Sequence, residues 1–237
     1  MENTQVTICA CASRSFIDKE RVAGIAAAMK KKGYHVIVEA DLCRKVMEAS
    51  PDMPDIAKGT ILACHSRAIA SHLNWLGLEV GRLVDIRSQD VHDILSQFDI
   101  SLPEAENVDG KDEFQRIIGA FPFEEGVDAW YPVLDKTRCT ECGKCHDFCL
   151  FGVYTVENKK VRVTLPQNCK NNCPACARMC PNKAIIFPKY EKSPINGGTE
   201  DEETFDPKDM DKMYRERLRM RLQERRVGVS LLKRDRK

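Results

Sequence analysis

Residues 139–150 read CTECGKCHDFCL, and residues 169–181 read CKNNCPACARMCP. These two runs hold eight of the 12 cysteines of the chain. The last three cysteines of the first run recur 31 positions later, whereas the first cysteine recurs after 30, because the second run contains one extra residue. The offset of 31 also aligns Tyr154 with Ile185. We therefore predict an internal repeat with a strand after each run and a pseudo-two-fold arrangement.

The spacing of these cysteines indicates which metal they would bind. Structural zinc sites usually take two close pairs of ligands from separated loops, so four cysteines in one short run, twice over, fit zinc poorly. A four-iron cluster takes three thiolates from one tight loop and a fourth from elsewhere, and the spacing C-x2-C-x2-C-x3-C of the first run supplies such a set. The spacing favours iron–sulfur clusters over zinc or free thiols.

Over residues 129–190 this pattern resembles the bacterial two-cluster ferredoxins. The resemblance implies two [4Fe-4S] clusters, because the two runs of that family exchange their last cysteines. The implied ligands are Cys139, Cys142, Cys145 and Cys180 for one cluster and Cys169, Cys173, Cys176 and Cys149 for the other. Two features depart from the family: Leu150 stands where proline is usual, and CKNNC contains the extra residue. Both can change the backbone N–H contacts that tune a cluster's potential.

The N-terminal residues show a different pattern, in which short β-branched runs alternate with amphipathic ones. Strands are predicted over residues 5–10, 35–40, 60–64 and 82–86, and helices over 18–32, 42–49 and 65–77. Such alternation predicts a parallel sheet with right-handed crossovers. The predicted fold is an α/β parallel-sheet N-terminal domain plus an α+β two-cluster ferredoxin-like domain with a C-terminal helix.

Composition divides the chain into four parts. We predict an α/β domain over 1–98, an acidic linker over 99–128 with one helix at 111–119, the ferredoxin-like domain over 129–190, and an acidic, mobile loop and basic helix over 191–237. Asp206 is the predicted N-cap of that last helix. Its apolar side chains recur every four residues: Met210, Tyr214, Leu218 and Leu222. The helix is either a docking arm for a larger redox subunit or a solvated helix resting on its own domain, and binding to nucleic acid or to a membrane surface is a third, less favoured interpretation.

The remaining cysteines are Cys9, Cys11, Cys43 and Cys64, which lie at or just after the ends of three predicted strands. In an open parallel sheet, the carboxyl ends of the strands form the crevice where ligands bind. Cys9 and Cys11 would point the same way from an extended strand. These positions favour a [4Fe-4S] cluster, and leave open buried structural thiols, or a zinc or redox-active dithiol site.

The CAC, LC and AC pattern, together with ILACHSRAIASHL and VDIRSQ, resembles the N-terminal domain of the large flavoprotein subunit of heterodisulfide reductase. This second resemblance spans residues 5–98. It implies a third [4Fe-4S] cluster, held by the four N-terminal cysteines, and a partner of the heterodisulfide-reductase type.

Four polar side chains lie close to cysteines. His65, beside Cys64, is a candidate ligand or proton donor, although a residue that borders the site is the simpler interpretation. His146 is a candidate for tuning the first cluster, with a solvated helix residue as the simpler interpretation. Arg14 and Arg67 would offset cluster charge or contact a partner, unless they are ordinary surface arginines.

Several classes of function are disfavoured. The chain has 37 Lys and Arg against 36 Asp and Glu, so its overall charge favours neither nucleic acid nor an acidic partner. The sequence contains neither a secretory signal nor an apolar run of membrane-spanning length, and we predict a cytoplasmic protein, in which cysteines are ligands more often than disulfides. It also lacks G-x-G-x-x-G and G-x-x-x-x-G-K-[ST], so we predict no flavin, NAD or nucleotide site.

Without a two-electron cofactor, the chain is predicted to carry electrons rather than to transform a substrate. We expect it to relay single electrons between redox partners as a subunit of a heterodisulfide-reductase-like complex. The predicted partner is a larger flavoprotein or oxidoreductase subunit that docks near the basic C-terminal helix. Two alternatives remain: a catalytic disulfide or thiol reductase subunit, and a redox-sensing regulator whose basic tail binds nucleic acid.

Overall fold

A computed structural model of the chain describes residues 5–101, 110–121 and 129–199, together with Arg215 and Arg219. The chain divides into two compact units, Met1–Glu202 and Glu203–Lys237, and all the strands and helices from β1 to β8 belong to the first. The helix predicted over 206–226 lies outside the described residues, apart from the exposed Arg215 and Arg219. No helix among the described residues is long and apolar enough to cross a membrane.

The N-terminal residues form a four-stranded parallel sheet in the order β2-β1-β3-β4. Its strands are β1 (Gln5–Cys9), β2 (His35–Glu39), β3 (Thr60–Ala63) and β4 (Arg82–Asp85). The central strands β1 and β3 are buried on both faces beyond their first residues, and the buried side chains are apolar except for Thr7 of β1. All four strands lie within the runs predicted from the sequence.

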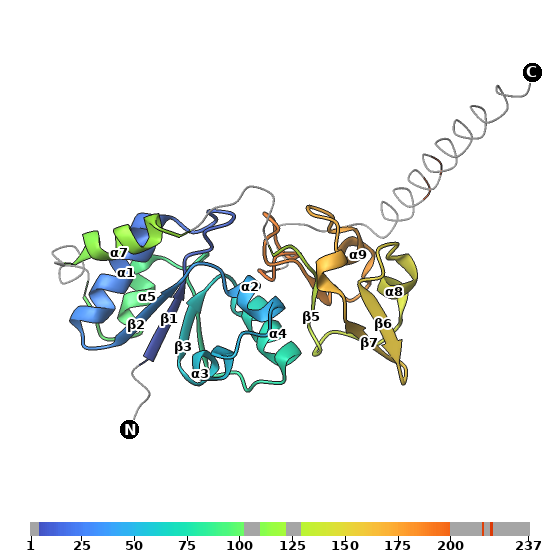
Figure 1. The fold of residues 1–237 in the computed structure, drawn as a ribbon, viewed down its shortest axis with the longest axis horizontal. Helices are drawn as coiled ribbons and strands as arrows, with labels where there is room; N and C mark the ends of the chain where they lie inside the picture. The colour runs from blue at the N-terminus through green and yellow to red at the C-terminus, as the bar shows by residue number, and fades with distance from the viewer. Residues whose placement is uncertain (1–4, 102–109, 122–128, 200–214, 216–218, 220–237) are drawn as a thin grey trace, which may run out of the picture. The chain divides into compact units, whose positions relative to one another are not determined.

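Helices cover both faces of this sheet (Figure 1). On one face, Val6 and Ile8 of β1 share an apolar core with α1 (Lys19–Lys31), α5 (Val91–Ser96) and α7 (Lys111–Gly119). On the other face, Ile61 and Ala63 of β3 pack with α2 (Leu42–Met47), α3 (Met53–Lys58) and α4 (Ser66–Leu76). The two faces alternate along each strand because successive side chains point to opposite sides.

α7 lies inside the stretch predicted to be a linker. Its bounds agree with the predicted helix, but Phe114 and Ile118 are buried in the same core as α1. Lys30 of α1 also pairs with Glu113 of α7, with 2.8 Å between Nζ and Oε2. This part of the predicted linker is therefore packed on the α/β layer.

The cysteine-rich segment is built from short elements. They are β5 (Val133–Leu134), α8 (Lys144–Phe148), β6 (Tyr154–Glu157), β7 (Lys160–Val163), the 3-10 helix η1 (Pro166–Asn168), α9 (Ala175–Met179) and β8 (Ile185–Ile186). β5 pairs with β8 and β6 pairs with β7, both antiparallel. The strand predicted after each cysteine run is confirmed, since β6 follows the first and β8 the second.

The cysteine-rich segment packs directly on the α/β layer. Ile186 of β8 belongs to the core beneath α4, and Arg67 of α4 donates from Nε to Asp135 at 2.7 Å. Residues 193–196 are buried as well, although the sequence predicted a mobile loop there. Both segments lie in one compact unit, and the predicted boundaries between domains remain predictions.

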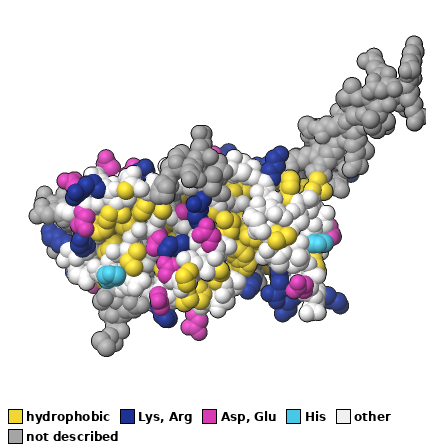
Figure 2. Space-filling view, viewed as in Figure 1, with side chains coloured by type: hydrophobic (Ala, Val, Ile, Leu, Met, Phe, Trp, Pro, Cys, Tyr) yellow, Lys and Arg dark blue, Asp and Glu magenta, His cyan; other side chains and the backbone are white. Residues whose placement is uncertain are grey.

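Charges of both signs are interspersed on the face drawn in Figure 2, with hydrophobic side chains between them. This distribution agrees with the near-equality of 37 basic and 36 acidic residues in the chain.

Two glycines in the α/β layer make a matched test of this packing. A Cβ at Gly81 would lie 2.6 Å from the carbonyl oxygen of Ala57 and 3.1 Å from that of Gly59, whereas a Cβ at Gly24 in α1 meets nothing within 4 Å. We expect Gly81→Ala to lower the free energy of unfolding by about 1–3 kcal/mol through overpacking. Gly24→Ala should raise it by about 0.5–1 kcal/mol, because alanine costs less backbone entropy in a helix. Urea denaturation of anaerobically prepared protein measures both, and a neutral Gly81→Ala would contradict the packing.

Candidate functional site

Four cysteines of the cysteine-rich segment line one cavity: Cys139, Cys142, Cys145 and Cys180. The cavity opens to solvent, and Leu134, Val161 and Ile185 also line it. Burial raises the pKa of Cys145 to about 11, and the nearby Cys180 and Cys139 raise it further. The structure thus brings the last cysteine of the second run to the first three of the first run.

A second set gathers in the same way: Cys169, Cys173, Cys176 and Cys149. Burial raises the pKa of Cys169 to about 12, and Cys173 and Cys149 contribute to the increase. Cys176 on α9 is buried and accepts a hydrogen bond from the Tyr154 hydroxyl, with 3.1 Å between oxygen and sulfur. Cys149 of the first run therefore lies with the second run. The assignment of these eight cysteines as ligands remains a prediction.

Both cysteine loops contain tight turns with residues in the left-handed backbone conformation. Glu141 in the first loop and Asn172 in the second have left-handed φ angles of 55° and 60°. Gly143, with φ of 75°, lies immediately before α8, and its lack of a Cβ allows this conformation at no steric cost. Leu150, at the family's proline position, is 65% exposed, so its side chain is not needed to pack the loop.

The N-terminal cysteines gather at the carboxyl ends of β1, β2 and β3. They are between 5% and 9% exposed: Cys9, Cys11, Cys43 and Cys64. Burial raises the pKa of Cys9 to about 12, with Cys11 and Asp41 adding to it. Burial also raises the pKa of Cys43 and of Cys64. Other thiols of the same set raise these two pKa values further. The four sulfurs are thus close enough to interact electrostatically.

The expected geometry of Cys9 and Cys11 is wrong in one respect. β1 ends at Cys9, and Cys11 has a left-handed φ of 48° rather than an extended one. Cys9 packs in the core of one sheet face and Cys11 in that of the other. A turn after the strand, and not strand alternation, therefore keeps the two thiols near each other.

The environment of the N-terminal thiols bears on their chemistry. Reactive cysteines are partly exposed and have a lowered pKa, because the thiolate is the nucleophile. The four N-terminal cysteines are buried and each has a raised pKa, so they are poorly suited to attack a disulfide. A metal displaces the thiol proton on binding, which makes a raised pKa compatible with a metal ligand.

Each set supplies four sulfur donors, the number and type that a [4Fe-4S] cluster requires. Among the residues that the structure describes, no three His, Cys, Asp or Glu side chains converge on a point that would hold a single metal ion. A four-iron cluster lies between its thiolates and does not require that convergence. The donor chemistry of all three sets therefore fits such a cluster.

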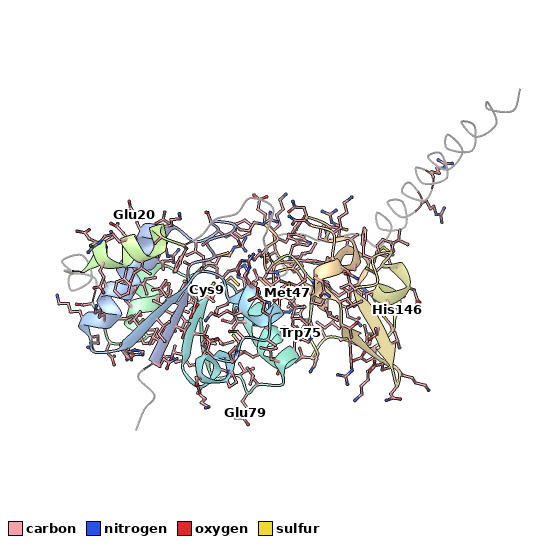
Figure 3. The ribbon with its side chains drawn as sticks, viewed as in Figure 1. Cys9, Glu20, Met47, Trp75, Glu79 and His146 are labelled. Carbon is pink, nitrogen blue, oxygen red and sulfur yellow. The ribbon has the colours of Figure 1, made fainter. Side chains whose placement is uncertain are left out.

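The two histidines differ in environment. His65 is buried, and its Nδ1 lies 3.0 Å from Asp85 Oδ2, while its Nε2 has no partner within the described ranges. It borders the N-terminal cysteine set next to Cys64. His146 is exposed on α8, pairs with Asp147 at 3.0 Å, and lies away from Cys9 in Figure 3.

Neither arginine is an ordinary surface residue. The Arg67 side chain is 17% exposed and bonded to Asp135. Arg14, three positions after Cys11, donates from Nη2 to the side-chain oxygens of Asn171 at 3.1 Å and Asn172 at 2.7 Å. These asparagines belong to the loop with the extra residue, so the departure in CKNNC coincides with a contact to the N-terminal cysteine region.

Sequence reasoning missed the aromatic side chains that connect two of the cysteine sets. Tyr131 is buried, and its hydroxyl donates to the Cys43 carbonyl oxygen at 2.6 Å and lies 2.9 Å from His72 Nε2. Cys43, Tyr131 and Cys169 belong to one apolar cluster, together with Met47 and Trp75. Figure 3 labels Met47 and Trp75 on the helices that border this cluster. The sequence offered no periodic signal for Tyr131, because its partners are 59 and 88 residues away.

Tyr131→Phe tests this connection. The substitution removes the hydroxyl and leaves the Cys43 carbonyl and His72 Nε2 without that partner in a buried site, so we expect the free energy of unfolding to fall by about 1–3 kcal/mol. The control is Tyr190→Phe, because the Tyr190 hydroxyl bonds only the half-buried Arg178 among the described residues, at 2.8 Å. We expect Tyr190→Phe to lower the free energy of unfolding by about 1 kcal/mol or less. Equal losses in urea denaturation would contradict the buried network.

Comparison with known proteins gives a consistent result. No family model matches the chain. Three curated proteins of Methanocaldococcus jannaschii are similar to it, and each is named an uncharacterized ferredoxin. The first is 54% identical over 67 residues, which are 28% of this chain and 45% of that protein. The second is 34% identical over 71 residues, 27% of this chain and 47% of that protein.

The third relative is 37% identical over 58 residues, which are 23% of this chain and 74% of that protein. The chain therefore spans about half the length of the first two relatives and about three quarters of the third.

Proposed function

Because the chain belongs to the ferredoxin family and is an iron–sulfur electron-transfer protein, we propose that it relays single electrons between redox partners through three [4Fe-4S] clusters. Such clusters accept and release one electron at a time, at potentials set by net charge, hydrogen bonds to sulfur and solvent exposure. The protein's contribution is to supply thiolates and to fix that environment.

The proposed ligands are the three cysteine sets. The first is Cys139, Cys142, Cys145 and Cys180; the second is Cys169, Cys173, Cys176 and Cys149; the third is Cys9, Cys11, Cys43 and Cys64. The grouping of the thiols in three sets, in which every member except the exposed Cys142 is buried or half-buried, supports this assignment. Peptide N–H groups also face sulfur: Ala184 N lies 3.3 Å from Cys180 Sγ, and Leu42 N lies 3.5 Å from Cys9 Sγ.

The observation that carries the proposal of a relay is the shared apolar cluster of Cys43 and Cys169. A relay needs neighbouring redox sites, and this cluster joins the N-terminal set to the second set. Arg14 contacts the same second loop through Asn171 and Asn172. The first set is the one with an exposed member, Cys142, which suits exchange with an external partner.

We also propose that the chain is a subunit of a heterodisulfide-reductase-like complex. The support for this is the CAC, LC and AC pattern of the N-terminal cysteines, which resembles that of the large flavoprotein subunit of heterodisulfide reductase. Leu150 and Phe151, which follow Cys149, are 65% and 44% exposed and offer an apolar contact to a larger flavoprotein. The alternative of a catalytic thiol reductase is less well supported, because the N-terminal thiols are buried and have raised pKa values.

Iron analysis tests the proposal directly. Anaerobically purified protein should contain about twelve iron and twelve acid-labile sulfide per chain, because each of three clusters holds four. Cys43→Ala combined with Cys64→Ala should reduce both to about eight while the spectra of the other two clusters persist. About eight in the unmodified protein would show that the N-terminal cysteines hold no cluster.

The Tyr154 hydroxyl gives a second test. It donates to Cys176 Sγ at 3.1 Å, and a hydrogen bond to a thiolate stabilises the extra negative charge of a reduced cluster. Tyr154→Phe should therefore make the midpoint potential of one cluster more negative. Redox titration followed by electron paramagnetic resonance measures this potential. Tyr190→Phe, which removes a hydroxyl that bonds Arg178 instead of sulfur, should leave all potentials unchanged, and equal behaviour of the two variants would contradict the role of Tyr154.

A further inference from the structure

A buried lysine from the cysteine-rich segment reaches the N-terminal cysteine site. Lys189 follows β8, and its side chain is 2% exposed. Its Nζ pairs with the carboxylate of Asp41 and contacts the hydroxyl of Ser13. Ser13 also donates to Asp41, with 2.9 Å between the oxygens. Lysine is almost never this buried without a charged partner.

The partners of Lys189 are next to N-terminal cysteines in the chain. Asp41 is the N-cap of α2, where its carboxylate accepts from the backbone N–H of Cys43 at 3.0 Å. Ser13 belongs to the turn that follows Cys11. The ammonium of Lys189 is therefore held between the two segments that carry these cysteines.

The charges of Lys189 and the cysteines influence one another. Burial raises the pKa of Cys11, and the positive charge of Lys189 is the next largest influence and lowers it. Burial lowers the pKa of Lys189, but Cys43 and Asp41 outweigh this effect and raise its pKa above the ordinary value. The ion pair with Asp41 keeps Lys189 a cation between the two segments that carry these cysteines.

Arg87 holds this lysine in place. Arg87 lies just after β4. Its guanidinium donates to the backbone carbonyl oxygens of Pro188 at 3.3 Å, Tyr190 at 3.3 Å and Glu191 at 2.8 Å. These carbonyls flank Lys189 on both sides. The side chain is therefore fixed by two independent contacts with the α/β layer, one at Asp41 and one through Arg87.

We propose that Lys189 is the counter-ion of the N-terminal cysteine site and raises the midpoint potential of the cluster held there. The inference rests on the third cluster of the proposed function. Reduction adds one negative charge to a site that already contains four thiolates, so a fixed, desolvated cation nearby favours the reduced state. The cysteines that hold this cluster come from the α/β layer, but the cysteine-rich segment supplies the positive charge that adjusts the midpoint potential of the cluster.

The test is a charge series at this site. Lys189→Met should shift the midpoint potential of the N-terminal cluster to more negative values, by about 59 mV if the ratio of reduced to oxidised protein changes tenfold at a fixed potential. Lys189→Arg should stay close to the unmodified protein. Asp41→Asn, which preserves the cap but removes the negative charge, should shift the potential to more positive values. Lys192→Met, at an exposed position of the same segment, is the matched control and should cause no shift.

Redox titration followed by electron paramagnetic resonance measures the series, and the N-terminal signal is the one lost in the combined Cys43→Ala and Cys64→Ala variant. Opposite shifts for Lys189→Met and Asp41→Asn support the proposal, because a mere loss of packing would not reverse sign. An unchanged potential in Lys189→Met with about twelve irons retained overturns it. So do shifts of the same sign in the two variants.

Two further outcomes are decisive. If Lys189→Met fails to retain the cluster, Asp41→Asn decides alone, and an unchanged or more negative potential there overturns the proposal. If the unmodified protein holds about eight irons, the third cluster of the proposed function fails and this inference fails with it. The iron content therefore separates failure of the proposed function from failure of the role of Lys189.

Discussion

Twelve thiols held in three sets of four are the constraint on which the rest of this structure depends. Bringing such groups together away from water opposes their ionisation, and burial raises the pKa of Cys9, Cys145 and Cys169 to about 12, 11 and 12. The fold can nevertheless hold them close as neutral thiols. A metal that displaces the protons would turn this electrostatic cost into binding free energy, so cluster insertion and folding should be coupled in this chain.

The packing between the two segments follows from that constraint. The N-terminal set lies at the edge of an open sheet, which by itself would leave it exposed to water. Tyr131, Ile186 and Lys189 of the cysteine-rich segment cover or contact that region, and Arg67 bonds to Asp135 from the other side of the contact. The two cysteine-containing parts are therefore best understood as one buried assembly rather than as two folds joined by a linker.

The sequence predicted what depends on local spacing and missed what depends on tertiary packing. The four strands were recognisable because each contains a short run of mostly β-branched or apolar residues, and the cysteine repeat was recognisable because ligand spacing is local. The helices α3 and α5 were missed. Each has six residues, less than two turns of a periodic pattern, although α2, which is equally short, was predicted. Lys189 and Asp41 are 148 positions apart, and no pattern in either neighbourhood indicates that they meet.

The extra residue in CKNNC shows how a departure from a motif can acquire a physical explanation. Asn171 and Asn172 are the bonding partners of Arg14, whose guanidinium also lies 5.2 Å from the ring centre of Trp130. Trp130 in turn stacks on Phe187, with 5.1 Å between ring centres, next to the segment that contains Lys189. A loop one residue shorter would have to lose or displace one of these asparagines. The insertion therefore places these asparagines in the contact between the second cysteine set and the N-terminal set, the two sets that the proposed relay would hold at a fixed distance.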